Sequence, residues 1–126
     1  MYNAFGLLTP ASEFTLDAAR DKLAKKFPAA AVAKTDGTVT LTGPDWDFQL
    51  FINDKPDVLT EHQAMAEKLG GVAANPEVAA CGRRVEVWSN TNDPFLEHFN
   101  DFISIIEVLQ SFPGVIAVDP KEPAFM

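Results

Sequence analysis

Histidine is the side chain best suited to acid–base and metal chemistry near neutral pH, and this 126-residue chain has two, His62 and His98. Asp101 follows His98 by three residues, so the two side chains would lie on one side of a helix. Zinc needs three or four such ligands, and paired spacings that make a metal motif specific, such as H-E-x-x-H, are absent. The sequence therefore predicts no metal and no cofactor, and it predicts that both histidines lie at the border of the core.

The segment from Cys81 to Arg84 offers a different chemistry. Two guanidinium groups can lower the pKa of a neighbouring thiol, and they can also hold a phosphate or a carboxylate. A catalytic cysteine needs a positioned base as well, and no local signature identifies one. Arg83 and Arg84 should point to opposite faces of a strand and therefore act separately. We expect a buried Cys81 and two arginines paired with surface acids, with contact to a ligand or a partner as the alternative.

Three carboxylates, Asp93, Glu97 and Asp101, recur at every fourth residue and would form a stripe on one side of a helix. Paired carboxylates can bind magnesium or transfer protons, but nothing else in the sequence converges on them. The stripe is predicted to be solvated, with a docking strip for a basic partner as the alternative. Glycine-rich phosphate-binding patterns are absent from the sequence.

One long helix, predicted from about residue 94 to residue 111, must position most of these side chains. Asp93 suits its cap and Pro94 its first position, while Pro113 and Gly114 suit its end. At 100° per residue its apolar side chains cover an arc of about 200°, whereas packing on a sheet needs a stripe a little over about 100° wide. The excess predicts a contact with another helix or another subunit. The candidate interface residues are Phe95, Phe102, Ile105 and Phe112, with Trp88 from the preceding strand.

The rest of the chain alternates between strand and helix patterns in the order β-α-β-β-β-α-β-α-β. We predict an α+β protein with a mixed, largely antiparallel sheet and about three helices packed mostly on one face, in a ferredoxin-like arrangement with additions. One domain is expected over residues 1–126, with residues 120–126 as a tail. The predicted strands are 2–9, 30–34, 38–42, 46–52, 84–88 and 115–118, and the other predicted helices are 15–27 and 57–69, with one further turn near 76–80.

Charge is the strongest compositional signal. The net charge is −8, and residues 91–126 carry only Lys121 against six acidic residues. Such a chain lacks the basic clusters that bind phosphate backbones, so nucleic acid is excluded as a partner. No stretch approaches the roughly 20 apolar residues of a membrane span, and the N-terminal residues lack the features of a signal peptide. With a single cysteine, these features predict a soluble cytoplasmic protein.

The function that these observations favour is protein binding without catalysis. No catalytic set is evident, the helix has excess apolar surface, and the acidity is concentrated in the last third of the chain. The expected partner is a second copy of the chain or a basic protein, as in an inhibitor or immunity-type protein that masks a basic surface. The alternative is a small enzyme or ligand-binding domain in which one arginine and one histidine converge in an enclosed pocket of about 300 Å³ or more.

Overall fold

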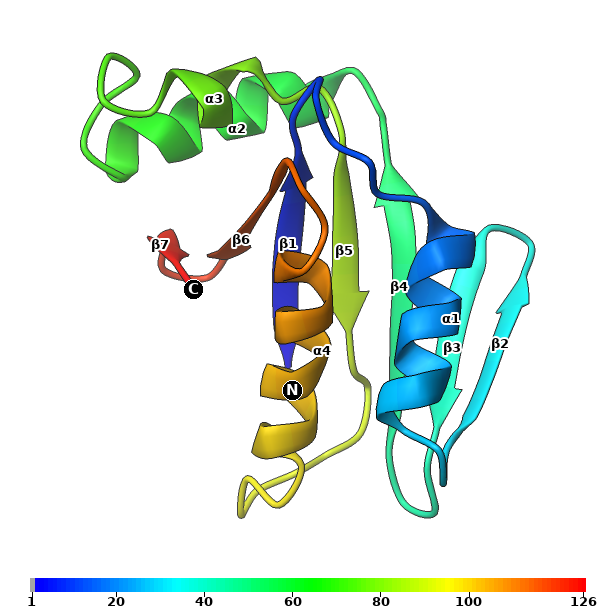
Figure 1. Ribbon diagram of the computed structural model, residues 1–126. Helices are drawn as coiled ribbons and strands as arrows, with labels where there is room; N and C mark the ends of the chain where they lie inside the picture. The colour runs from blue at the N-terminus through cyan, green and yellow to red at the C-terminus, as the bar shows by residue number, and fades with distance from the viewer. Residues whose placement is uncertain (1) are drawn as a thin grey trace.

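The computed structural model describes residues 2–126, which form one seven-stranded sheet with four helices (Figure 1). Every paired neighbour in the sheet is antiparallel, and the strand order is β2-β3-β4-β5-β1-β6-β7. The predicted α+β class with a largely antiparallel sheet is therefore confirmed. The elements are β1 (Asn3–Leu8), α1 (Leu16–Lys26), β2 (Ala31–Thr35), β3 (Thr38–Thr42), β4 (Asp47–Asn53), α2 (Asp57–Lys68), α3 (Pro76–Ala80), β5 (Arg84–Trp88), α4 (Phe99–Gln110), β6 (Val115–Asp119) and β7 (Ala124–Phe125).

Strand β1 lies in the interior of the sheet between β5 and β6. Both neighbours run antiparallel to β1, so β5 and β6 run in the same direction and α4 connects them across β1. In the other half of the sheet, α1 connects β1 to the edge strand β2 across β5, β4 and β3. This order is compatible with a ferredoxin-like arrangement with additions, but it does not by itself assign the chain to that fold.

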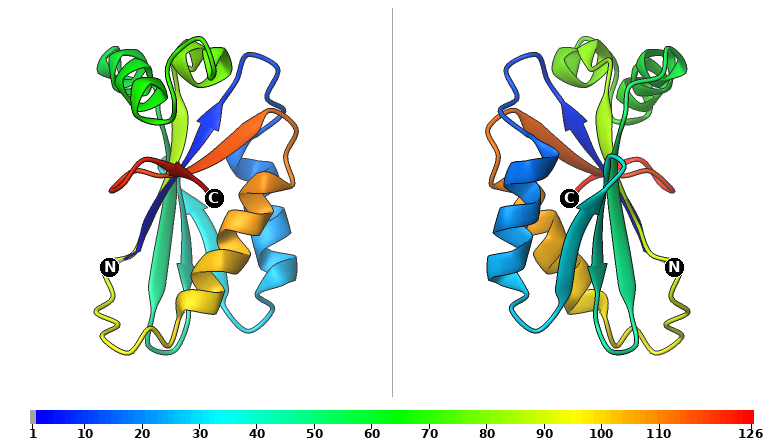
Figure 2. Two further views of the ribbon diagram at one scale, coloured as in Figure 1. Left: turned by 90° about the vertical axis from the view of Figure 1, so that its left-hand side faces the viewer. Right: turned by 90° about the vertical axis from the view of Figure 1, so that its right-hand side faces the viewer.

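Helices cover both faces of the sheet, whereas the sequence predicted helices mostly on one face (Figure 2). The difference arises because successive side chains of β1 point to opposite faces of the sheet. Ala4 and Leu8 face α1 and α4, while Phe5 and Leu7 belong to a second cluster on the opposite face. That second cluster is closed by Met65 of α2 and by α3, which lie over one end of the sheet. A strand that is apolar on both faces needs cover on both.

The excess apolar surface of α4 is covered within the chain, so the predicted interface needs correction. Phe102, Ile105 and Phe112 are 5%, 0% and 5% exposed and belong to the main core. Helix α1 packs beside α4, and the Phe14 ring meets the Phe112 ring edge-on at 4.9 Å between centroids. These three residues therefore stabilise the fold and cannot contact a partner, whereas Phe95 and Trp88 are exposed.

The end of the chain also differs from the predicted tail, because β7 pairs with β6 and extends the sheet. The turn before β6 depends on Gly114, which has φ +79 and lies so close to Ser12 that a Cβ would meet the Ser12 backbone at 2.7 Å. Within residues 2–126, no helix is both long enough and apolar enough to cross a membrane.

Candidate functional site

The loop of residues 93–98 replaces the first turn and a half of the predicted helix, because α4 begins at Phe99. Leu96 has φ +55, a left-handed conformation that a continuous α-helix does not contain. The expected start at residue 94 was therefore wrong, although the helix exists and ends near residue 111 as predicted. Sequence patterns favour the helix here because Asp93 and Pro94 match its usual first residues.

Asp93 folds this loop and fastens it to the core. Its Oδ1 accepts a hydrogen bond from the Glu97 backbone N–H at 2.9 Å, and its Oδ2 accepts one from the His98 N–H at 2.8 Å. The Tyr2 hydroxyl donates to the same Oδ2 at 2.6 Å, and the Tyr2 ring stacks on Phe102 at 5.0 Å. These hydrogen bonds, that from Tyr2 first, hold the pKa of the Asp93 carboxyl below its ordinary value. Burial and the Asp93 carboxylate raise the pKa of Tyr2 to about 12.

The loop holds large apolar side chains in solvent. Phe95 is 83% exposed, Leu96 63%, and Phe99 at the start of α4 is 45% exposed. We call Phe95, Leu96 and Phe99 the aromatic surface; it lies at the end of the sheet opposite α2 and α3 (Figure 1). Trp88, at the end of β5, is 38% exposed, and its Nε1–H donates to Glu86 at 2.9 Å.

His98 stands beside the aromatic surface in a cluster of acidic side chains. Its side chain is 16% exposed, its Nδ1 lies 3.2 Å from Asp101 Oδ2, and its Nε2 lies 3.4 Å from Asp45 Oδ1. Burial alone would lower the pKa of His98, but the hydrogen bond to Asp101 and the charges of Asp45 and Asp93 raise it above its ordinary value. Asp45 belongs to the turn before β4, so no spacing in the sequence linked it to His98.

The three carboxylates of the predicted acidic stripe do not lie along one helix, because Asp93 and Glu97 precede α4. Each carboxylate has a separate role. Asp93 caps the loop, Asp101 contacts the His98 ring, and Glu97 is exposed beside Asp45 and His98. Trp46 adds an aromatic wall to the cluster, with its ring centroid 6.0 Å from that of His98. Its indole lies directly against Gly43, where a Cβ would come within 2.2 Å of it.

The other histidine is in a separate polar cluster beneath α2. His62 is fully buried, its Nδ1 lies 2.7 Å from the Cys81 carbonyl oxygen, and its Nε2 lies 3.4 Å from Arg84 Nη1. Arg84 is 6% exposed and forms ion pairs with Glu61 at 2.9 Å and Glu86 at 3.0 Å. The two predicted residues of the enzyme alternative, a histidine and an arginine, therefore do meet.

This meeting does not create the pocket that the alternative requires. The hollow beside Arg84 holds about 240 Å³, is open to solvent, and is lined in part by Phe5, Glu61, Lys68 and Pro120. His62 is not among its lining residues, and both carboxylates that pair with Arg84 already neutralise its charge. The arrangement is that of a buried ion-pair network under a helix.

Glu86 completes this network. Burial alone would raise the pKa of its carboxyl, but hydrogen bonds from Asn53, Trp88 and Arg84 outweigh burial and lower it. The Asn53 amide donates at 2.8 Å and the Trp88 indole at 2.9 Å. Asn53, Trp88 and Arg84 all donate to the Glu86 carboxylate. A buried carboxylate with a structural role is normally hydrogen-bonded in this way.

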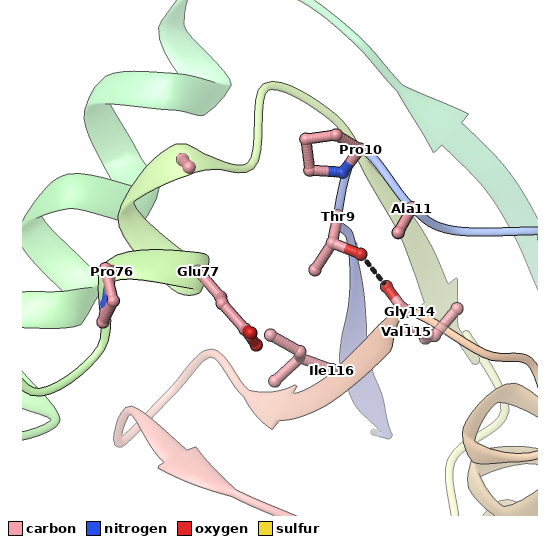
Figure 3. A pocket seen from close by; sticks show the side chains of 9 residues that line it. Thr9, Pro10, Ala11, Pro76, Glu77, Gly114, Val115 and Ile116 are labelled. Carbon is pink, nitrogen blue, oxygen red and sulfur yellow. Dashed lines mark hydrogen bonds between the residues drawn. The ribbon is translucent and has the colours of Figure 1, made fainter.

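A hollow of about 690 Å³ lies between α3, residues 9–11 and the start of β6 (Figure 3). Its walls are mostly apolar, with Glu77 as the charged lining residue. The Thr9 hydroxyl donates to the Gly114 carbonyl oxygen at 2.8 Å. No histidine, arginine or cysteine lines this hollow, and the Thr9 hydroxyl is already hydrogen-bonded to the Gly114 carbonyl oxygen.

Cys81 and Arg83 do not form a reactive pair. The Cys81 side chain is fully buried, its Sγ donates to the Glu77 carbonyl oxygen at 3.1 Å, and burial raises the pKa of the thiol to about 11. Arg83 is exposed and precedes β5, whereas Arg84 is buried. The expectations of a buried cysteine and of two arginines with separate surroundings agree with this arrangement.

Comparison with known proteins adds no assignment: no protein-family model, no curated protein and no solved structure matches the chain at a significant level. Function must therefore be inferred from the geometry described above.

Proposed function

We propose that this protein is a binding module that uses the aromatic surface to contact a basic protein. The observation that carries the proposal is the exposure of Phe95, 83%, in a loop that Asp93 ties to the core. A large exposed aromatic side chain in a fixed position is typical of the residues that dominate binding energy in protein interfaces.

Order in the loop supports this proposal. A surface that is already in its bound conformation loses little conformational freedom on binding, which favours affinity. Here the loop is held by Asp93 and by the buried Tyr2 ring. The left-handed conformation of Leu96 is costly for a residue with a side chain, and a cost of this kind is expected where the chain uses the conformation for function.

Charge indicates the chemistry of the partner. The acidic residues Asp45 and Glu97 are exposed next to the loop, and the sequence between Arg84 and Lys121 contains neither lysine nor arginine. With a net charge of −8, the protein should attract and orient a basic surface. An inhibitor or immunity-type role in the cytoplasm, masking such a surface, fits these features, and the single buried thiol suits that reducing compartment.

Photo-crosslinking tests the proposal directly. A photoreactive phenylalanine analogue is placed at position 95 of the full chain in the cells that produce it, and the adducts formed on illumination are identified by mass spectrometry. The matched control carries the same analogue at Leu59 of α2, which is 40% exposed at the other end of the molecule. We expect an adduct with a basic protein from position 95 and none from position 59.

Binding of the identified partner is then measured for the unaltered protein and for Phe95→Ser. We expect a loss of at least tenfold in affinity for Phe95→Ser and little change for Leu59→Ser, with affinity falling as salt is raised. An adduct with a second copy of this chain would mean that the aromatic surface serves self-association and does not bind a basic protein. Identical adducts from positions 95 and 59 would overturn the proposal.

A further inference from the structure

We propose that Asp45, Glu97 and His98 form a site for a zinc ion. Each residue offers one ligand atom, and these atoms lie within 4.8 Å of one another. The three residues come from two segments, the turn before β4 and the 93–98 loop, which the fold brings together at one end of the sheet. This inference does not depend on the proposed function.

The distance between two of the ligand atoms suits tetrahedral zinc. Zinc bonds to imidazole nitrogen and carboxylate oxygen are about 2.0–2.1 Å long, so two ligand atoms at a tetrahedral angle lie about 3.3–3.4 Å apart. His98 Nε2 and Asp45 Oδ1 are 3.4 Å apart. The Glu97 carboxylate is exposed and lies within 4.8 Å of both atoms, so it is the third ligand once it moves closer, and water would occupy the fourth position, as in zinc sites with three protein ligands.

Asp101 supplies the second partner that zinc-binding histidines normally have. A carboxylate can only accept a hydrogen bond, so the 3.2 Å contact with Asp101 Oδ2 places a proton on His98 Nδ1. The lone pair on Nε2 then faces Asp45 and is the one available to a metal. A carboxylate that orients a ligand histidine in this way is a recurrent feature of zinc sites, and it makes Asp101 a positioning residue.

The ring of His98 is also held in place by its surroundings. Its side chain is 16% exposed and lies beside the Trp46 indole, while its backbone N–H is bound by Asp93. One imidazole and two carboxylates favour zinc over magnesium and calcium, which prefer oxygen ligands alone. The 3.4 Å contact would also form as an ion pair of a protonated His98 without metal, and experiment must separate these two explanations.

The test uses the full chain, from which a chelator has first removed any metal. Zinc chloride is then titrated into the protein at neutral pH, and the heat of binding is measured by calorimetry. We expect one zinc ion per chain, and no measurable binding of magnesium under the same conditions. Asp45→Asn and His98→Gln should each weaken zinc binding at least tenfold. Asp101→Asn should weaken it by about 10–100-fold, the usual effect of removing a carboxylate that orients a ligand histidine.

Glu107→Gln is the matched control, because Glu107 is an exposed acid on α4 outside the cluster and loses the same charge. It should bind zinc as the unaltered chain does. Circular dichroism shows whether each variant is folded, and the 66% exposure of the Asp45 side chain makes Asp45→Asn the variant least expected to disturb the fold. Absence of zinc binding, or binding that His98→Gln and Asp45→Asn leave unchanged (an adventitious ion only), would overturn the site. Neither result would affect the crosslinking test, which needs no metal.

Discussion

Leu96 has a backbone conformation that does not help to stabilise the fold. A leucine at φ +55 costs roughly 1–2 kcal/mol relative to the right-handed region, and its side chain is 63% exposed. Neither core packing nor local propensity explains a leucine at this position. The proposed contact with a partner would explain it, because the partner would bury the side chain.

Replacing Leu96 by glycine should therefore change stability little. Glycine removes the left-handed strain but adds roughly 0.4–1 kcal/mol of conformational entropy to the unfolded chain, so we expect the free energy of unfolding to stay within about 1 kcal/mol of its original value. Urea unfolding followed by fluorescence measures it. A buried leucine would lose about 2–5 kcal/mol on truncation to alanine, so a loss above 2 kcal/mol would mean that Leu96 packs against the core.

Among the elements, β1 shows how closely the sheet and α4 approach each other. Gly6 lies on the face of β1 that α4 covers, and a Cβ there would meet Val85 Cγ1 at 2.8 Å and Val115 Cγ1 at 3.1 Å. Leu109 of α4 would be 3.5 Å away. The absence of a side chain at residue 6 therefore lets the two neighbouring valines and α4 close over the strand.

Gly6→Ala should lower the free energy of unfolding by about 1–2 kcal/mol. Overpacking costs roughly 1–3 kcal/mol, and the smaller entropy of the unfolded alanine chain offsets part of it. Gly82→Ala is the control, since no atom lies within 4 Å of a Cβ at residue 82, and it should be neutral or slightly stabilising. Equal urea midpoints for Gly6→Ala and the unaltered protein would contradict the close packing described above.

The elements were largely predictable from the sequence, but the site was not. Apolar alternation in residues 38–42 and the Asp36–Gly37 turn are local signals, and the β2–β3 hairpin forms as they predict. The predicted start of α4 was wrong because Asp93 is bound by Tyr2, which lies 91 residues away. The residue pattern around Asp93 contains no sign of this contact. The pairing of Asp45 with His98 was missed for the same reason, and Phe102 and Phe112 were assigned to an interface because nothing local indicated that α1 would help to cover α4.

At the scale of the whole molecule, the buried polar cluster under α2 makes stability depend on pH. Burial, the largest effect, lowers the pKa of His62 in the folded protein. The folded state therefore binds a proton less readily than the unfolded chain, and stability falls as pH drops below the ordinary histidine value of about 6.5. Glu86 adds a loss in the same direction at lower pH, whereas the raised pKa of His98 acts in the opposite sense.

Comparison with His62→Asn isolates the contribution of His62, because asparagine can donate to the Cys81 carbonyl but does not titrate. We expect the stability advantage of the unaltered protein over His62→Asn to be smaller at pH 5.5 than at pH 7.5, measured by urea unfolding. In addition, NMR titration of the unaltered protein should give the His62 ring a pKa below the ordinary value. An advantage that is constant or grows towards acid pH would contradict a neutral buried His62.

The central position of β1 has a consequence for biosynthesis. Its partners among the described strands are β5 and β6, so during synthesis β1 can pair with the first only after residues 84–88 have followed, and with the second only after residues 115–119. The hydrogen bond from the Tyr2 hydroxyl to Asp93 likewise cannot form until Asp93 has been made. The apolar residues of β1 face both sides of the sheet, so they stay without their sheet neighbours until those two segments have been made. Such non-local pairing is associated with slow folding, and the nascent chain should depend on chaperones during this interval.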